Sequence, residues 1–276
     1  MEESLAKTGL FQPHAIFVRL WRHRALILRL ARREIEARYR GSFLGLAWAV
    51  IAPLILLTVY TFVFSVVFKL RWANTSGTGE FALMVFTGII PFNIFAECIN
   101  RSPDLMLENV SYVKKVLFPL DIMPMVSLAS ALFNAFFSVL VLMVFYLFVH
   151  GLPPVTALAA PLALIPMLLS ILGLTWFLSA LGVYIRDLRQ FIGILVMTLM
   201  FLSPIFYPLT AVPEGYRSLY LLNPVAVVIV DLRGMLFAGE WPDLFNWATY
   251  LVLSALLAHL GYLWFMKTRE GFADVV

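Results

Sequence analysis

Long runs without charged side chains constrain this chain more than any other feature of its sequence. A helix of about 20 apolar residues crosses the hydrocarbon core of a membrane. Only 13% of the residues are charged, whereas a soluble globular domain carries about 25%. The sequence therefore predicts an all-α membrane protein, a single domain over residues 1–276 with six transmembrane helices. The predicted spans are residues 41–68, 81–98, 122–149, 157–185, 190–208 and 244–266.

The distribution of lysine and arginine predicts how these spans are oriented. Cytoplasmic loops of membrane proteins carry an excess of both residues. If the N-terminus is cytoplasmic, sixteen of the 20 Lys and Arg residues lie on the cytoplasmic side. The four on the outer side are Lys69, Arg71, Arg217 and Arg233. We therefore expect both termini to lie in the cytoplasm.

A basic helix is expected immediately before the first span. Residues 15–40 contain eight arginines and no lysine, and most of the arginines lie opposite an apolar face on a helical wheel. One interpretation is an anchor to anionic lipid headgroups, with about 1 kcal/mol of attraction per arginine. The other is that the basic face holds an anionic lipid-linked substrate or a cytosolic partner, and the two are compatible. The candidate residues of this interface helix are Arg29, Arg32, Arg33, Glu34, Arg38 and Arg40.

The longest internal cytoplasmic segment contains residues 101–118. Apolar residues stand there beside two lysines, and a short helix with this pattern would dock in a groove on a soluble partner. The alternative is an ordinary connecting loop whose lysines only follow the membrane topology. The candidate contact residues are Asp104, Leu105, Leu107, Glu108, Val110, Tyr112, Lys114 and Lys115.

A second irregular segment lies between the last two predicted spans. Residues 214–238 are too apolar for a free loop, yet Asn223-Pro224 interrupts them and they include Asp231 and Arg233. Backbone polar groups at membrane depth must form their hydrogen bonds within the protein. We therefore predict a re-entrant helical hairpin at the outer face.

Several classes of activity lack their sequence signatures. The sequence has no P-loop motif G-x-x-x-x-G-K-[ST] and no zinc motif H-E-x-x-H. Its single cysteine, Cys98, excludes a multi-cysteine metal site, and no nucleophile–base pair stands out. Among ionisable residues only His259 lies deep in a span and Glu97 lies near an end, which argues against proton or ion coupling. We predict no catalysis, metal site or cofactor on this chain, and no nucleic-acid binding.

Aromatic residues make up 15% of the chain, and many lie within or beside the spans. Their faces suit the CH faces of sugar rings, and the alternative for each one is ordinary lipid contact or helix packing. The candidates for a substrate pathway are Tyr60, Phe62, Phe64, Phe92, Phe95, Phe201 and Tyr207.

Five stretches of the sequence carry a resemblance to a known family. They are RREIEARYRGSFLGLAWAVIAPL (Arg32–Leu54), FTGIIPFNIF (Phe86–Phe95), YIRDLRQ (Tyr184–Gln190), SPIFYPLTAVPEGYR (Ser203–Arg217) and LNPVAVVI (Leu222–Ile229). In this order and spacing, they resemble the membrane subunit of type-2 ABC exporters of polysaccharides such as O-antigen, capsule or teichoic acid. The likeness covers nearly the whole chain.

The resemblance implies an assembly in the bacterial cytoplasmic (inner) membrane. It implies a homodimer with two copies of a cytosolic ABC ATPase, which would hold ATP and Mg²⁺, and a pathway between the protomers for a lipid-linked glycan. It also implies an interface helix at residues 32–40, a coupling helix within residues 100–115, and a hairpin broken at Asn223-Pro224. The turn at Arg186-Asp187 matches the family pattern without an assigned role. The alternative is a type-2 ABC exporter of drugs or other small hydrophobic substrates.

Overall fold

The computed structural model describes residues 13–63, 78–115, 118–220 and 223–275, and all regular secondary structure within these ranges is helical. The longer helices are α4 (Trp48–Tyr60), α5 (Thr78–Arg101), α7 (Met123–His150), α8 (Ala160–Tyr184), α9 (Leu188–Leu202) and α12 (Leu244–Thr268). The others are α2 (Pro13–Arg22), α3 (Arg24–Tyr39), α6 (Val110–Val113), α10 (Glu214–Tyr220), α11 (Pro224–Arg233) and α13 (Phe272–Val275). The 3-10 turns are η1 (Gly45–Ala47), η3 (Ser102–Asp104), η4 (Leu107–Asn109), η5 (Leu120–Ile122), η6 (Val155–Ala159), η7 (Leu209–Ala211) and η9 (Arg269–Gly271). Residues Gly234–Ala238 form a π-helical turn, η8.

Five segments in the described part of the chain are long and apolar enough to cross a membrane. They are Gly45–Val63, Gly79–Asp104, Leu120–His150, Val155–Tyr184 and Leu244–Val275. The predicted all-helical membrane fold is therefore confirmed. The sixth predicted span, residues 190–208, contains α9, which is apolar but only 15 residues long and ends before Ser203-Pro204. A complete sixth span stays a prediction.

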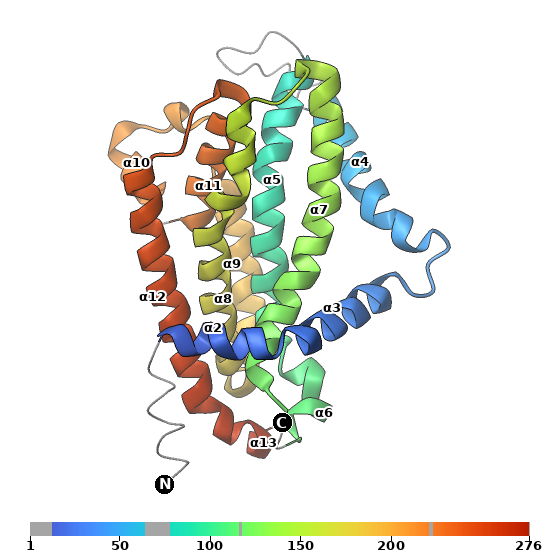
Figure 1. Cartoon of the computed structure of the whole chain (residues 1–276), viewed down its shortest axis with the longest axis vertical. Helices are drawn as coiled ribbons and strands as arrows, with labels where there is room; N and C mark the ends of the chain where they lie inside the picture. The colour runs from blue at the N-terminus through green and yellow to red at the C-terminus, as the bar shows by residue number, and fades with distance from the viewer. Residues whose placement is uncertain (1–12, 64–77, 116–117, 221–222, 276) are drawn as a thin grey trace.

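The long helices form a bundle, and shorter helices cover both of its ends (Figure 1). Helices α5, α7, α8 and α12 run along the long axis, with α5 packed between α7 and α8. Helices α2, α3 and α6 lie at one end, called here the interface end, and α10 and α11 lie at the other, the hairpin end. In the most apolar 18-residue stretch of the segment that contains α5, 78% is buried inside the protein. The corresponding stretch around α4 is 17% buried. Helix α5 is therefore central and α4 peripheral.

Helices α8 and α12 approach each other closely because two glycines meet between them. A Cβ atom added to Gly261 would lie 2.1 Å from the carbonyl oxygen of Gly173. The Ser170 hydroxyl donates to the Ser254 hydroxyl at 2.8 Å across the same interface. Small residues and interhelical hydroxyl bonds are typical of tight helix packing in membranes.

The predicted interface helix over residues 15–40 is divided into α2 and α3 at His23. At this point the Arg24 guanidinium lies over the Trp21 ring and donates to the Trp21 carbonyl oxygen at 3.0 Å. Helix α2 is fixed by an ion pair, because Arg19 Nε lies 2.7 Å from Asp121 Oδ2 in η5, the turn before α7. The Asp121 side chain is fully buried, and a buried charge requires such a partner.

At the hairpin end, a helix break occurs at the predicted position, between α10 and α11. The Asn223 side chain accepts hydrogen bonds from the backbone N–H groups of Val225 and Ala226, while Pro224 occupies the first helical position. The Asn223 amide also donates to the Ser203 hydroxyl at 2.9 Å, which ties the break to the turn after α9. The re-entrant placement of residues 214–238 in the membrane stays a prediction.

Arg233 fixes this segment to the bundle. Its guanidinium donates to the carbonyl oxygens of Met84 on α5 and of Pro204 and Ile205 after α9. A Cβ atom added to Gly88 would lie 3.0 Å from Arg233 Nη2, so the absence of a side chain at Gly88 makes room for the guanidinium. The sequence predicts a cation on the outer side here, and the structure gives the half-buried Arg233 a structural role.

Candidate functional site

The last residue of α5 joins the interface helix to the coupling region, residues 101–118. The Arg101 guanidinium donates to the Glu34 carboxylate on α3, and its Nε lies 3.1 Å from Glu108 Oε2 in η4. Only 26% of the Arg101 side chain and 16% of the Glu34 side chain are exposed, so solvent screens this pair less than a surface ion pair. One side chain therefore connects α3, α5 and the coupling region.

A second contact joins α3 to α6. Arg33 Nη1 donates to the Tyr112 hydroxyl at 2.5 Å, and the guanidinium carbon lies 5.4 Å from the centre of the Tyr112 ring. The Tyr112 ring stacks on Phe118 with 4.3 Å between ring centres, and the Lys115 ammonium lies 5.6 Å from the Tyr112 ring. Tyr112 is thus held between cations and an aromatic ring.

The coupling region is also attached to α8 and α9. Asp104 Oδ2 lies 3.2 Å from Arg189 Nε at the start of α9. A Cβ atom added to Gly182 would lie 2.1 Å from the Pro103 carbonyl oxygen, so η3 rests directly on the backbone of α8. A displacement of the coupling region therefore acts on three long helices at once.

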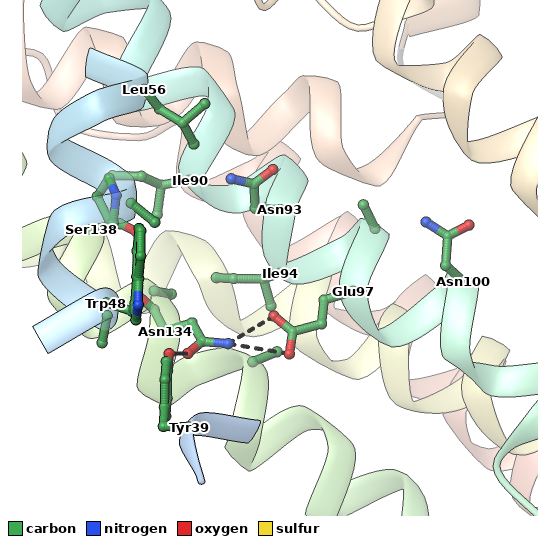
Figure 2. A pocket seen from close by; sticks show the side chains of 16 residues that line it. Tyr39, Trp48, Leu56, Ile90, Asn93, Ile94, Glu97, Asn100, Asn134 and Ser138 are labelled. Atoms are coloured by element: carbon green, nitrogen blue, oxygen red, sulfur yellow. Dashed lines mark hydrogen bonds between the residues drawn. The ribbon is translucent and has the colours of Figure 1, made fainter. Parts of the chain in front are cut away.

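A cavity of about 420 Å³ lies between α4, α5 and α7 near the interface end (Figure 2). We call it the polar groove. Asn93, Glu97 and Asn100 line it from α5, and their spacing of four and three residues places them on one face of that helix. Asn134 and Ser138 line it from α7. The remaining lining residues are Tyr39, Trp48, Ala49, Ala52, Pro53, Leu56, Ile90, Ile94, Ala96, Ala131 and Ala135.

Glu97 is the centre of a hydrogen-bond network in the polar groove. The Asn134 amide donates to both Glu97 carboxylate oxygens, at 3.2 and 3.1 Å, as Figure 2 shows. Arg38 Nη2 on α3 donates to Glu97 Oε1 at 2.5 Å, and the Tyr39 hydroxyl donates to Asn134 Oδ1 at 3.0 Å. The network connects the interface helix directly to the wall of the groove.

Tyr39 keeps its proton in this network. Burial raises the pKa of its hydroxyl above the ordinary value, the neighbouring Arg38 lowers that pKa, and the Glu97 carboxylate raises it further. The protonated hydroxyl is the form that donates to Asn134. With Tyr39 as donor to Asn134, and Asn134 as donor to Glu97, the carboxylate is held in a fixed orientation.

Residues 25–237 match the family model described as ABC-2 type transporter, which is well over half of the chain. The chain belongs to the ABC-2 type transporter family. It is 28% identical over 259 residues to the O-antigen export system permease protein RfbA of Myxococcus xanthus, covering 93% of this chain and 97% of that protein. A protein of the same name from Klebsiella pneumoniae is 25% identical, with 91% and 95% covered. The polysialic acid transport protein KpsM of Escherichia coli is 23% identical, with 86% and 91% covered.

The predicted contact residues of this ABC-2 type transporter differ in exposure at the interface end. Leu105 is buried in the bundle, whereas Leu107, Val110 and Tyr112 are half-buried. The charged residues Glu108, Lys114 and Lys115 are exposed. Arg29 on α3 and Arg40 just after its end are exposed, and Arg32 forms an ion pair with Glu36 at the surface. Contact of these residues with an ATPase stays a prediction.

The described pathway aromatics lie outside the polar groove. Phe92 and Phe95 are buried on other faces of α5, and Phe95 forms part of the wall of an apolar cavity of about 760 Å³ between α8, α9 and the hairpin end. Tyr60 lies against Phe206, and Tyr207 shares a hydrogen bond with Tyr220. Phe62 and Phe201 are exposed. Phe64 lies outside the described residues, and a pathway role for the set stays a prediction.

Sequence reasoning missed most of the polar groove. It placed Glu97 near the end of a span and gave no role to Asn93, Asn100 or Asn134. The spacing of Asn93, Glu97 and Asn100 along an apolar helix is a signal that could have identified one wall. Within the described part of the chain, no group of three or more His, Cys, Asp or Glu residues could hold a metal ion.

Proposed function

We propose that this chain is the membrane permease subunit of an ATP-driven exporter of lipid-linked polysaccharide, such as O-antigen or capsular polysaccharide. The observation that carries the proposal is the similarity to O-antigen permeases over more than nine-tenths of the chain. The polysialic acid transport protein adds a relative named for a second type of glycan. Our proposal includes six spans, a re-entrant hairpin, and both termini in the cytoplasm of a bacterial inner membrane.

ATP hydrolysis belongs, in this proposal, to two copies of a separate ABC ATPase subunit bound to a homodimer of this chain. The sequence has no P-loop of its own, so the energy must come from a partner. The exposed charges Glu108, Lys114 and Lys115 support the coupling region as the contact surface. Their neighbours Arg101 and Tyr112 connect that surface to α3 and α5.

The proposed mechanism is mechanical. ATP binding brings the partner subunits together and displaces the coupling region and the interface helix. The contacts of Arg101 with Glu34 and of Arg38 with Glu97 pass this displacement to α5 and the polar groove. The ATPase drives the cycle only if it binds the closed and conducting arrangements with different affinities.

Two measurements test this function. Deleting the gene should remove polysaccharide from the cell surface, and the wild-type gene should restore it. The purified chain alone should lack ATPase activity, and an ABC ATPase should copurify with it only while residues 100–115 are intact. Normal surface polysaccharide in the deletion strain would exclude the proposed function.

Export of drugs or other small hydrophobic molecules is the second candidate, and the apolar cavity of about 760 Å³ favours it. A deletion strain that becomes drug-sensitive and keeps its surface glycan would support this candidate. Loss of the glycan with unchanged drug sensitivity would reject it.

A further inference from the structure

We infer that the polar groove is a contact site for the hydroxyl groups of the transported saccharide, with Asn93, Glu97 and Asn100 as the residues that bind them. The inference rests on the proposed function and extends it, because it assigns a substrate-binding role to specific residues. The expected ligand is a neutral, hydroxyl-rich sugar unit. The contact would be made near the interface end, where α4, α5 and α7 surround the groove.

The first support is the state of the two α5 amides. Asn93 and Asn100 are exposed, and neither side chain forms a hydrogen bond with another residue in the part of the chain that the structure describes. Figure 2 shows Asn93 beside the cavity, on the helix that also carries Glu97 and Asn100. Polar side chains within membrane helices are costly unless they meet water, a protein partner or a ligand.

The second support is the match between these groups and sugar hydroxyls. Each asparagine amide offers two donors and an acceptor, and a hydroxyl both donates and accepts. The Glu97 carboxylate accepts from Asn134 and Arg38 and retains acceptor capacity for a further donor. The three residues extend along α5 for about 10 Å, given a rise of 1.5 Å per residue. The cavity of about 420 Å³ lies within the usual range of small-ligand sites.

The third support is that the groove is preorganised and disfavours an anion. Asn134, Arg38 and Tyr39 hold the Glu97 carboxylate in place before any ligand arrives. No lysine or arginine in the described part of the chain lines the groove, and Arg38 beside it is already paired with Glu97, so a phosphate group would find no free cation there. Trp48, 40% exposed, adds an aromatic surface to the wall, which suits the CH face of a sugar ring.

Thiol labelling tests occupancy of the groove directly. In a Cys98→Ser background, Asn93→Cys and Asn100→Cys are introduced separately into the full transporter with its ATPase. A small water-soluble methanethiosulfonate is applied to membranes from cells that synthesise the lipid-linked glycan and from cells that lack its synthesis. Both thiols should react, and the glycan should slow the reaction. Ser42→Cys, an exposed position outside the groove, should react at the same rate in both membranes.

Export measurements test whether the contact matters for transport. The double variant Asn93→Leu/Asn100→Leu should reduce the rate of glycan export roughly fivefold to tenfold, the factor that corresponds to the loss of one or two hydrogen bonds. Asn93→Gln should lose less of the export rate than the leucine variant does, because glutamine retains an amide. The matched control is Asn246→Leu, which removes an exposed amide at the start of α12 and should leave export unchanged. Copurification with the ATPase should remain at the wild-type yield in every variant.

Several outcomes would overturn the inference, and they are distinct from failure of the proposed function. Equal labelling with and without glycan, in a strain whose surface glycan depends on this gene, would reject the groove as a contact site and leave the function standing. Slow labelling in both membranes would show that the groove is closed to water whether or not the glycan is present, and would reject the inference. Lost copurification in the double variant would assign the two amides a structural role. Normal surface glycan in the deletion strain would reject function and inference together.

Discussion

At the scale of single residues, the interface end is organised by charged side chains that each bridge several elements. Arg101 contacts acidic residues on two different segments, and Arg38 connects α3 to the carboxylate in the polar groove. Arg32 instead pairs with Glu36 on its own helix, where both side chains are exposed. An exposed ion pair contributes about 0–1 kcal/mol to the free energy of unfolding. Removing one partner of a sheltered pair costs more, because it leaves an unpaired charge shielded from water.

Arg101→Ala should therefore lower stability more than Arg32→Ala does. We expect a loss of roughly 1–3 kcal/mol for Arg101→Ala, since the sheltered Glu34 carboxylate loses its cation. Arg32→Ala should change stability by about 0.5 kcal/mol or less. Thermal unfolding of the purified proteins in detergent compares the two. Equal shifts in Tm would show that Arg101 is no more important than a surface arginine.

At the scale of elements, close backbone contacts fix how helices cross. Gly261 touches the Gly173 backbone between α8 and α12, whereas a Cβ atom added to Gly193 on α9 would meet nothing within 4 Å.

Gly261→Ala should force α8 and α12 apart and lower the free energy of unfolding by about 1–3 kcal/mol or more. Gly193→Ala should be neutral or slightly stabilising, because alanine favours a helix over glycine. The yield and Tm of the two variants measure the difference, and a neutral Gly261→Ala would refute the close contact.

The hairpin end depends on Arg233 in a comparable way. Arg233→Gln should free residues 214–238 from α5, because the shorter amide cannot replace the fork that binds three carbonyl oxygens. We expect the free energy of unfolding to fall by roughly 2–4 kcal/mol and backbone amides in this segment to exchange hydrogen faster. The matched control is Arg217→Gln, because Arg217 contacts only nearby positions among the described residues: it donates to the carbonyl oxygens of Thr210 and Val212 and lies 3.7 Å from Glu214 Oε1. Unchanged exchange in Arg233→Gln would contradict the proposed anchoring.

Sequence patterns predicted the elements better than their contacts. The apolar runs identified the long helices, and Asn223-Pro224 marked a helix break, because both depend on local composition. The meeting of Glu97 with Asn134 depends on how α5 and α7 are aligned, and no local pattern encodes that alignment. The contact of Gly173 with Gly261 likewise joins residues distant in the chain. The interruption of the basic helix at His23 lies beside the contact of Arg24 with the Trp21 carbonyl oxygen, which a helical wheel does not show.

At the scale of the whole molecule, the two ends have different roles in our account. The interface end carries the basic helix, the coupling region and the polar groove, and the hairpin end is fixed to α5 by Arg233. Central helix α5 passes between them, with Arg101 at one end and the Arg233 contact at Met84 near the other. A displacement at the coupling region therefore has a continuous packed path to the hairpin end.

ATP-dependent movement of glycan across a membrane tests the central claim most directly. The chain and its partner ATPase are reconstituted in proteoliposomes, with lipid-linked glycan present in the outer leaflet. Our account predicts that ATP makes the glycan progressively resistant to an added glycosidase, and that vesicles with this chain alone show no such change. Glycan that stays fully sensitive while the complex hydrolyses ATP, or becomes resistant without ATP, would contradict the account.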